Sequence, residues 1–332
     1  LKAGTSASLQ PGIVIRKANA NNLKNTDVKI PSGGMIVITG VSGSGKSTLV
    51  YDVLYASKEK NRACGCVSVE GLERFQRIVA VRQKSQISSS TGTPATYTGI
   101  FDHIRDVFAA TDDAKRLSLR KNHFSFTEKA GWCETCQGRG KVKVSMDFLS
   151  DVWRVCDDCQ GSRYRAEVLS CLYHDKNIAQ VLEMTMQEAA DFFAGHKTLA
   201  TQFAMLQKVG LGYLQLGQAL DTLSGGETQR LTLATELMKT AKGPSLYLLD
   251  EPSTGLHFRD VEYLLALFRE LVAKGHTLIV IEHDPQIILQ ADYVIDLGPG
   301  GGNNGGYLIA QGGVEDIIAC EQSVTGRFLK NR

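Results

Sequence analysis

The chain has 332 residues, enough for about two domains with a sizeable hydrophobic core. Its 43% hydrophobic and 22% charged residues are typical of a globular protein, and its formal net charge of +2 neither favours nor excludes a nucleic-acid partner. It contains no run of about eighteen apolar residues and no positively charged, apolar leader, so we expect neither a membrane-spanning helix nor a secretion signal. Because it begins at Leu1 instead of methionine, we expect a processed product or part of a longer protein.

Strands and helices alternate at both ends of the chain, a pattern typical of an α/β domain with a mainly parallel sheet. Residues 1–34 suggest a loose leader followed by an edge hairpin. The elements expected next are a strand at 35–39, a helix at about 46–56 and a strand at 78–81. After residue 223 the alternation resumes, with strands expected at 245–249, 277–282 and 293–297 and helices at 257–274 and 285–290.

The middle of the chain differs from both ends. Residues 85–98 are rich in Ser and Thr and are expected to form a loop, whereas 99–110 have the apolar periodicity of a helix. Residues 111–172 are polar, contain cysteines and include short alternating segments such as 141–144, and 178–209 again has a helical pattern. We therefore expect the α/β domain to be interrupted by an insertion between about residues 84 and 210.

The strand at 35–39 leads directly into a glycine-rich motif that fits G-x-x-x-x-G-K-[ST] and precedes the expected helix. Its glycines let backbone N–H groups surround phosphates, and the helix N-terminus adds positive potential. Lys46 is expected to reach the β- and γ-phosphates of ATP, and Ser47 to bind Mg²⁺. The alternative is a glycine-rich turn without a ligand, which the flanking strand and helix disfavour. The residues expected to bind the nucleotide here are Gly40, Ser42, Gly43, Ser44, Gly45, Lys46, Ser47 and Thr48.

The apolar strand at 245–249 ends in two acids, Asp250 and Glu251. Because ligands of open parallel sheets bind at the C-terminal edge, we expect Asp250 to hold Mg²⁺ and Glu251 to polarise the attacking water as general base. Two acids after a strand more often belong to a solvated loop, but the phosphate motif favours the catalytic interpretation. His283 follows the next strand and is expected near the γ-phosphate. The histidines expected to be structural are His103, His123, His174, His196 and His276.

Four of the eight cysteines form two C-x-x-C pairs with nineteen residues between them. In a chain without an export signal, this spacing favours a metal over disulfides. Each pair can form a tight knuckle, and two knuckles provide four thiolates for a tetrahedral, structural Zn²⁺. The expected ligands are Cys133, Cys136, Cys156 and Cys159, whereas Cys64, Cys66, Cys171 and Cys320 are expected to be buried or idle thiols. The aromatic residues near these pairs are expected to pack against the zinc core instead of stacking on bases: Trp132, Phe148 and Trp153.

Residues 223–230 read Leu-Ser-Gly-Gly-Glu-Thr-Gln-Arg and precede an amphipathic helix. A Ser-Gly-Gly turn at a helix N-terminus is an anion site, and this one resembles the signature motif of the ABC ATPases. The resemblance implies that Ser224, Gly225 and Gly226 face the nucleotide on a second ATPase head. It also implies a Q-loop glutamine at Gln83 and a D-loop at residues 253–257.

A closer resemblance is to the C-terminal half of the UvrA family, the damage-sensing ATPases of bacterial nucleotide excision repair. The stretches that carry it are 20–25, 39–49, 94–99, 209–213, 222–230, 249–257, 281–284, 297–299 and 325–329. The resemblance implies ATP, Mg²⁺ and Zn²⁺ as cofactors and a cytoplasmic protein that is not in a membrane. The implied partners are double-stranded DNA, other repair proteins and a second ATPase head, which either another copy or a missing N-terminal half supplies.

The segment after Gln83 departs from the family, because residues 84–90 replace a stretch that usually contains Pro and Arg. This departure leaves open a UvrA-like paralogue, for example one in drug self-resistance, or an ABC-type ATPase with a protein or ribosomal partner. The fold expected from the resemblance is an ABC-type P-loop ATPase interrupted by a zinc-ribbon-containing helical insertion. Its parts are expected at 1–84 (first part of the ATP-binding core), 85–240 (signature domain with the zinc module at 131–165) and 241–332 (second part of the core).

Overall fold

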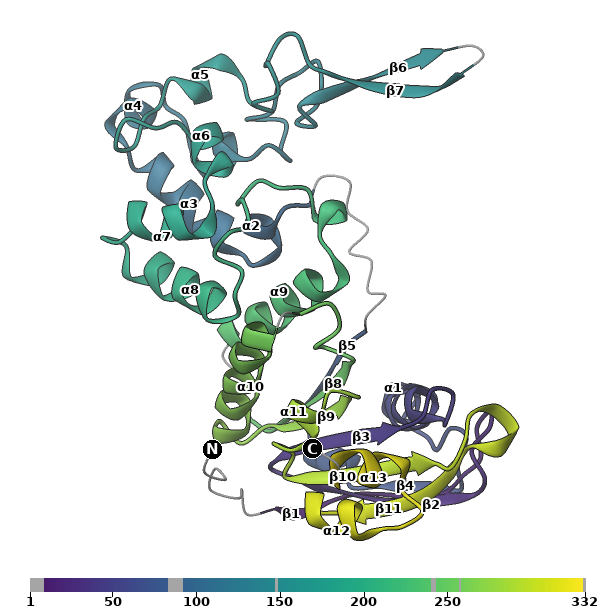
Figure 1. The fold of residues 1–332 in the computed structure, drawn as a ribbon. Helices are drawn as coiled ribbons and strands as arrows, with labels where there is room; N and C mark the ends of the chain where they lie inside the picture. Colours follow the sequence, from purple (N-terminus) through teal and green to yellow (C-terminus); the bar gives the residue numbers. More distant parts are fainter. Residues whose placement is uncertain (1–8, 83–91, 147–148, 240–242, 257, 331–332) are drawn as a thin grey trace. The chain divides into compact units, whose positions relative to one another are not determined.

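The computed structural model describes residues 9–82, 92–146, 149–239, 243–256 and 258–330. The chain divides into two compact units, of which unit 1 comprises Leu1–Ser85 and Lys239–Arg332 and unit 2 comprises Gln86–Met238. Among the described residues, no helix is long and apolar enough to cross a membrane. The α/β class predicted from the alternating pattern is confirmed, because both ends of the chain contribute strands to one mostly parallel sheet (Figure 1).

The main sheet of unit 1 has six strands in the order β11-β10-β3-β9-β8-β5. Neighbours from β10 to β5 run parallel, and β11 pairs antiparallel with β10 at one edge. The four inner strands β10, β3, β9 and β8 are buried on both faces along nearly their whole length, as expected for a parallel sheet that is covered on both sides. The bounds of the six strands are β3 (Met35–Gly40), β5 (Arg77–Val81), β8 (Ser245–Asp250), β9 (Thr277–Ile281), β10 (Tyr293–Gly298) and β11 (Tyr307–Gly312).

A second sheet of unit 1 is antiparallel, with the order β2-β1-β4. Its strands are β1 (Gln10–Ala18), β2 (Thr26–Ser32) and β4 (Ser68–Glu70). The predicted hairpin therefore exists but does not lie at an edge of the parallel sheet. Inward-facing side chains of the two sheets belong to one buried core, for example Ile15 and Val28 with Ile36 and Ile279. Burial of this alternating face explains why the hairpin forms its own layer.

The helix after the phosphate motif begins at Lys46 and continues to Glu59, somewhat beyond the predicted end. Residues Thr48–Tyr55 are wound as a π-helix, and α1 (Ala56–Glu59) completes it. Leu49, Val50 and Leu54 are fully buried, so this helix packs its apolar side into the core. The other helices of unit 1 are α10 (Phe258–Ala273), α11 (Pro285–Ile288), α12 (Val314–Ala319) and α13 (Val324–Lys330).

Unit 2 is helical apart from one two-stranded ribbon. Its helices are α2 (Pro94–Tyr97), α3 (Ile100–Ala109), α4 (Asp112–Arg116), α5 (Ala166–Leu169), α6 (Ile178–Glu183), α7 (Met186–Phe192), α8 (Lys197–Lys208) and α9 (Gly225–Met238). Buried aromatic rings fill its interior, including Phe108 with Phe124 and Phe126 with Tyr164. The ribbon pairs β6 (Lys141–Met146) with β7 (Leu149–Val155) and extends away from the helices of its unit (Figure 1).

A further expectation about local structure was wrong. Part of the Ser/Thr-rich segment predicted as loop is the helix α2, because Thr93 accepts the N–H of Thr96 as an N-cap and Pro94 occupies the first helical position. Residues 83–91 of that segment lie outside the described residues. No elements were predicted after residue 297, where β11, α12 and α13 are only six or seven residues long.

Candidate functional site

The phosphate motif lies at the C-terminal end of β3, where the backbone approaches β10 closely. Gly40 has a φ of 132°, and a Cβ there would be 2.0 Å from the carbonyl oxygen of Leu297. Only glycine fits this position, because any side chain would collide with the neighbouring strand. Gly43 and Gly45 also have positive φ angles, of 75° and 103°. These residues give the loop the tight curvature that a phosphate-binding backbone requires.

Lys46 extends beneath the loop that it follows. Its Nζ donates hydrogen bonds to the carbonyl oxygens of Gly40 at 2.9 Å and Val41 at 3.0 Å. Burial lowers the pKa of Lys46, while the charges of Glu251 and Asp250 act in the opposite direction. Lys46 and the two predicted acids therefore belong to one electrostatic site at the C-terminal edge of the sheet.

The hydroxyl groups of the motif have different surroundings. Among the described residues, the buried Ser44 Oγ is without a hydrogen-bond partner, which suits a donor kept for a ligand oxygen. Ser47 is exposed at the start of the helix. Thr48 Oγ1 instead accepts a hydrogen bond from Asn21 Nδ2 at 3.1 Å. Thr48 therefore helps to anchor the helix, in addition to its predicted place at the nucleotide.

A second glycine-rich loop, at residues 298–306, supports the phosphate motif. The N–H of Gly302 donates to the carbonyl oxygen of Gly43 at 3.0 Å, and that of Gly306 donates to the carbonyl oxygen of Ser44 at 3.1 Å. Asn22 joins the two loops, because its Nδ2 donates to the carbonyl oxygens of Gly43 at 2.8 Å and Gly302 at 3.3 Å. The role of Asn22 is not visible in the sequence, because its partners lie 21 and 280 positions away in the chain.

Asp250 ends β8 and Glu251 follows it, at the same edge as the phosphate motif. Burial and the charge of Glu251 raise the pKa of Asp250. Glu251 has a φ of 45°, and its Oε1 lies 3.6 Å from Nε2 of His283. Burial and the charge of Lys46 lower the pKa of His283, against the opposing charge of Glu251, which favours the neutral imidazole. The structure thus brings together the predicted base and the predicted histidine.

Glu282, which precedes His283, is a further acid at this edge that the sequence analysis left without a role. It is 2% exposed and accepts three backbone N–H groups, from Ser253 at 2.8 Å, His283 at 2.9 Å and Asp284 at 3.2 Å. These bonds hold the segment after β8 against the end of β9. Glu282 therefore shapes the backbone that carries both Glu251 and His283.

In unit 2, the signature residues begin α9. The N–H of Glu227 donates to Ser224 Oγ at 3.2 Å, and the N–H of Ser224 donates to Glu227 Oε2 at 2.7 Å, which is a capping box. The hydroxyl of Tyr213 also donates to Glu227, and burial together with this contact raises the pKa of Tyr213 to about 12. Gly225 and Gly226 form the first turn of the helix. The predicted Q-loop residue, Gln83, lies outside the described residues.

The two C-x-x-C pairs converge in unit 2. All four sulfur atoms lie within 4.8 Å of one another, with Cys133 3.9 Å from Cys156 and Cys136 3.6 Å from Cys159. Zn–S bonds of about 2.3 Å in a tetrahedron require sulfur separations of about 3.8 Å, so this cluster fits a zinc ion. Burial raises the pKa of the Cys136 thiol to about 12, and a bound cation would offset this cost of ionisation.

The two knuckles have the same backbone conformation. In each, the second cysteine is followed by a Gln-Gly pair with positive φ angles, 51° and 76° at Gln137 and Gly138 and 49° and 84° at Gln160 and Gly161. The expectation that Trp153 packs against the zinc core was wrong. Its side chain lies on β7 and is 46% exposed, and the Lys141 ammonium on the paired strand β6 lies 5.4 Å from its ring centroid.

Comparisons with known proteins agree with this geometry. The family described as "ABC transporter" matches residues 23–254. UvrABC system protein A of Staphylococcus aureus (strain COL) is 48% identical over 324 residues, which cover 96% of this chain and 34% of that protein. The protein of the same name from Aquifex aeolicus (strain VF5) is 47% identical, over 96% of this chain and 35% of its own length. The crystal structure of UvrA2 from Deinococcus radiodurans matches with a TM-score of 0.92 and 43% identity, covering 100% of this chain and 41% of that one.

The substitution Asn22→Asp tests the connection between the two glycine-rich loops. It keeps the shape of the side chain but replaces the Nδ2 donor with an oxygen facing two carbonyls. We expect nucleotide affinity to fall about tenfold, since hydrogen bonds contribute about 1 kcal/mol each and an unpaired acceptor adds a cost. Isothermal calorimetry with ATP measures the change. Asn25→Asp, at an exposed position of the same segment, is the matched control, and equal affinity in both variants would contradict the proposed role.

Metal content tests the cysteine cluster. We expect about one Zn²⁺ per chain by mass spectrometry of the purified, reduced protein, and less than half of that in Cys156→Ser, because a three-thiolate site binds zinc less tightly. Cys320→Ser, outside the cluster, is expected to keep full occupancy. A folded wild-type protein without zinc, or equal zinc content in the two variants, would refute the site.

Proposed function

We propose, on the premise that this chain belongs to the ABC ATPase family and is a UvrA-type member of it, that its ATP cycle gates recognition of damaged double-stranded DNA in nucleotide excision repair. The observation that carries the proposal is the 48% identity to UvrABC system protein A over 96% of the chain. The chain spans about a third of the length of that relative, with 34% covered. The activity of the whole relative is therefore proposed for this chain as one part of a larger machine.

The phosphate motif supports ATP binding. Gly43, Gly45 and the helix N-terminus present backbone donors to the phosphates, and the buried Ser44 hydroxyl supplies a further one. On binding, Lys46 would exchange its bonds to the Gly40 and Val41 carbonyls for the β- and γ-phosphates. Ser47 and Asp250 would hold Mg²⁺, which neutralises phosphate charge when bound. The half-buried Asp250, with its raised pKa, would ionise more readily beside such a cation.

Glu251 is the proposed general base for hydrolysis. Its carboxylate would take a proton from the attacking water, while the neutral His283 beside it orients that carboxylate or donates to the γ-phosphate. Gln83 would contact the same water or ion. A signature motif must face this site from a second head, and the Ser224, Gly225 and Gly226 of this chain would serve another head in the same way. We propose that the second head is either another copy or a further half of a longer protein.

The ribbon β6–β7 supports contact with DNA. Its strands contain three cations, Lys141, Lys143 and Arg154, and one acid, Asp151. All three cations are exposed, and so is Trp153. A two-stranded ribbon fits the major groove of DNA, and exposed cations contribute affinity by releasing counterions. Zinc would fix the base of this ribbon without taking part in catalysis, since all four of its ligands come from the protein. Partners beyond DNA, such as other repair proteins, follow from the relatives alone.

A UvrA-like paralogue and an ATPase with a protein or ribosomal partner are the competing proposals, because residues 84–90 differ from the usual family pattern. These alternatives share the nucleotide chemistry but do not require affinity for damaged duplex DNA. DNA binding therefore separates them from the repair function, whereas ATP turnover does not.

Glu251→Gln tests the base. The amide cannot accept the proton, so we expect ATP turnover to fall by about 10² to 10⁴ while ATP still binds. The measurement is phosphate release at several protein concentrations, because a second copy that supplies the signature would raise the rate per chain. Glu262→Gln, an exposed acid on α10, is the control and should leave turnover unchanged. Unchanged turnover in Glu251→Gln would overturn the assignment.

Salt-dependent binding tests the DNA contact. We expect the wild type to prefer a lesion-bearing duplex and to lose affinity steeply with salt. Replacing Lys141, Lys143 and Arg154 together by Gln should reduce the slope of log K against log salt by up to about 2.7, at roughly 0.9 per phosphate contact. The matched control replaces three exposed cations of unit 1 by Gln: Lys24, Lys60 and Arg62. Absence of binding to intact and damaged duplex, with and without ATP, would refute the repair function.

A further inference from the structure

The two zinc knuckles share a backbone conformation but differ in the arginine that follows each one. Arg139 follows the first knuckle and is exposed. Arg163 follows the second, has a φ of 77°, and accepts the N–H of Cys133 on its carbonyl oxygen at 2.8 Å. This bond ties the end of the second knuckle to the first cysteine of the first knuckle. The position of Arg163 therefore depends on the closed cysteine cluster.

The side chain of Arg163 leaves the zinc module and reaches another part of unit 2. Its Nη2 donates to the carbonyl oxygen of Gly217 at 3.1 Å, and its guanidinium carbon lies 5.1 Å from the ring centroid of Phe126. The aromatic face restrains the guanidinium plane while the hydrogen bond gives it direction. A planar, charged donor held in this way is suited to fixing a backbone carbonyl.

Gly217 lies seven residues before the signature serine, in a segment with little freedom. Its N–H donates to the carbonyl oxygen of Leu182 at 2.7 Å, and a Cβ at Gly217 would be 2.8 Å from that oxygen. Further along, the N–H of Leu220 donates to the carbonyl oxygen of Gly92 at 3.1 Å, and Leu220 itself is buried. The backbone from Gly217 to Ser224 is thus held at successive points, one of which is the zinc-module arginine.

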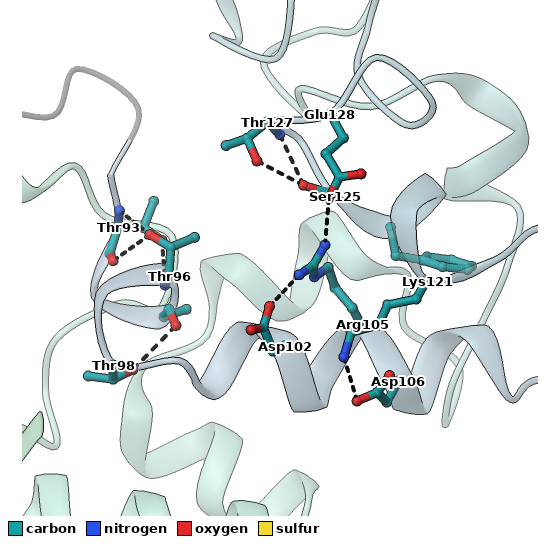
Figure 2. Close-up of polar contacts among 12 residues, drawn as sticks. Thr93, Thr96, Thr98, Asp102, Arg105, Asp106, Lys121, Ser125, Thr127 and Glu128 are labelled. Carbon is teal, nitrogen blue, oxygen red and sulfur yellow. Dashed lines mark hydrogen bonds and ion pairs between the residues drawn. The ribbon is translucent and has the colours of Figure 1, made fainter. Parts of the chain in front are cut away.

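A second connection leaves the zinc module on its other side, but it ends elsewhere. The backbone carbonyl of Glu128 accepts the N–H groups of Gly131 and Trp132. The carboxylate of Glu128 pairs with Arg105 of α3 at 3.1 Å (Figure 2). Arg105 also pairs with Asp102, and a cavity of about 240 Å³ lies beside these residues. The two carboxylates are 49% and 60% exposed, so water screens both pairs. This connection joins the module to α3 and not to the segment before the signature.

We propose that Arg163 is a positioning residue through which the zinc-bound knuckles hold residues 217–223, and thereby Ser224 and Gly225 at the start of α9, in the geometry needed to meet nucleotide on a second head. The inference rests on the proposed ATPase function. It adds that Arg163 is the residue through which zinc binding affects the position of the signature motif. Loss of zinc loosens the knuckles, withdraws Arg163 from Gly217, and frees the segment. The zinc contributes only by holding the backbone of the two knuckles in place.

The test combines hydrogen exchange with kinetics on the full chain. R163M keeps the apolar stem and the same backbone strain but removes the donor, R163K restores a donor, and R139M is the matched control on the other knuckle. We expect R163M to retain one zinc per chain and to exchange amides of residues 217–223 about tenfold faster than wild type. R163K restores a charged donor without the planar guanidinium, so its exchange should lie between wild type and R163M, and R139M should match wild type. ATP turnover should fall about tenfold in R163M with nucleotide affinity unchanged.

Zinc removal supplies the decisive comparison. Chelation should accelerate exchange of residues 217–223 in the wild type and add nothing in R163M, because the connection is already lost. Wild-type exchange in R163M, or an equal further increase on chelation in both proteins, would overturn the inference. If R163M fails to hold zinc, zinc-loaded R163K decides, since exchange no faster than in R139M would overturn the inference. If the wild type does not hydrolyse ATP, the proposed function is refuted. The hydrogen-exchange comparison would still test the role of Arg163.

Discussion

The close approach of two backbones, at the ends of β3 and β10, is the constraint on which the nucleotide site depends. The position that a Cβ of Gly40 would occupy is 2.0 Å from the Leu297 carbonyl, so the chain must turn there without a side chain. The turn brings the second glycine-rich loop beside the phosphate motif, where Asn22 bonds to both. The site is therefore largely shaped before any ligand arrives, which lowers the entropy cost of binding.

The acids at this edge of the sheet divide by how their oxygens are satisfied. Glu282 accepts three backbone N–H groups, and Asp296 accepts the hydroxyls of Ser323 at 2.6 Å and Thr325 at 3.1 Å. These two buried acids hold the framework together, one across β8 and β9 and the other between β10 and the C-terminal helix. Asp250 and Glu251 raise the pKa of Lys46 more than Asp296 does, which suits groups that face a charged ligand. Carboxylates at one edge of the sheet thus have different tasks: Glu282 and Asp296 hold the backbone, whereas Asp250 and Glu251 face the nucleotide site.

In unit 2, the cysteine cluster and the buried aromatic side chains both organise the short helices. The helices α2 and α4 to α7 have seven residues or fewer, and helices of this length gain stability from tertiary packing more than from their own hydrogen bonds. Buried rings such as Phe126 and Tyr164 provide that packing. The two knuckles add a fixed point in the chain. The ribbon β6–β7 lies between them in sequence, and Arg163 reaches from the second knuckle to Gly217.

The sequence by itself determined the elements whose signal is local. Apolar runs located the parallel strands, the spacing of glycines with Lys46 located the phosphate motif, and two C-x-x-C pairs located the cysteine cluster, because each pattern depends on residues adjacent in the chain. Only the tertiary structure decided the separate antiparallel sheet, the placement of Asn22 against Gly302, and the reach of Arg163 to Gly217. Those contacts join residues separated by 280 and 54 positions, and no local pattern encodes which distant backbone a side chain will meet.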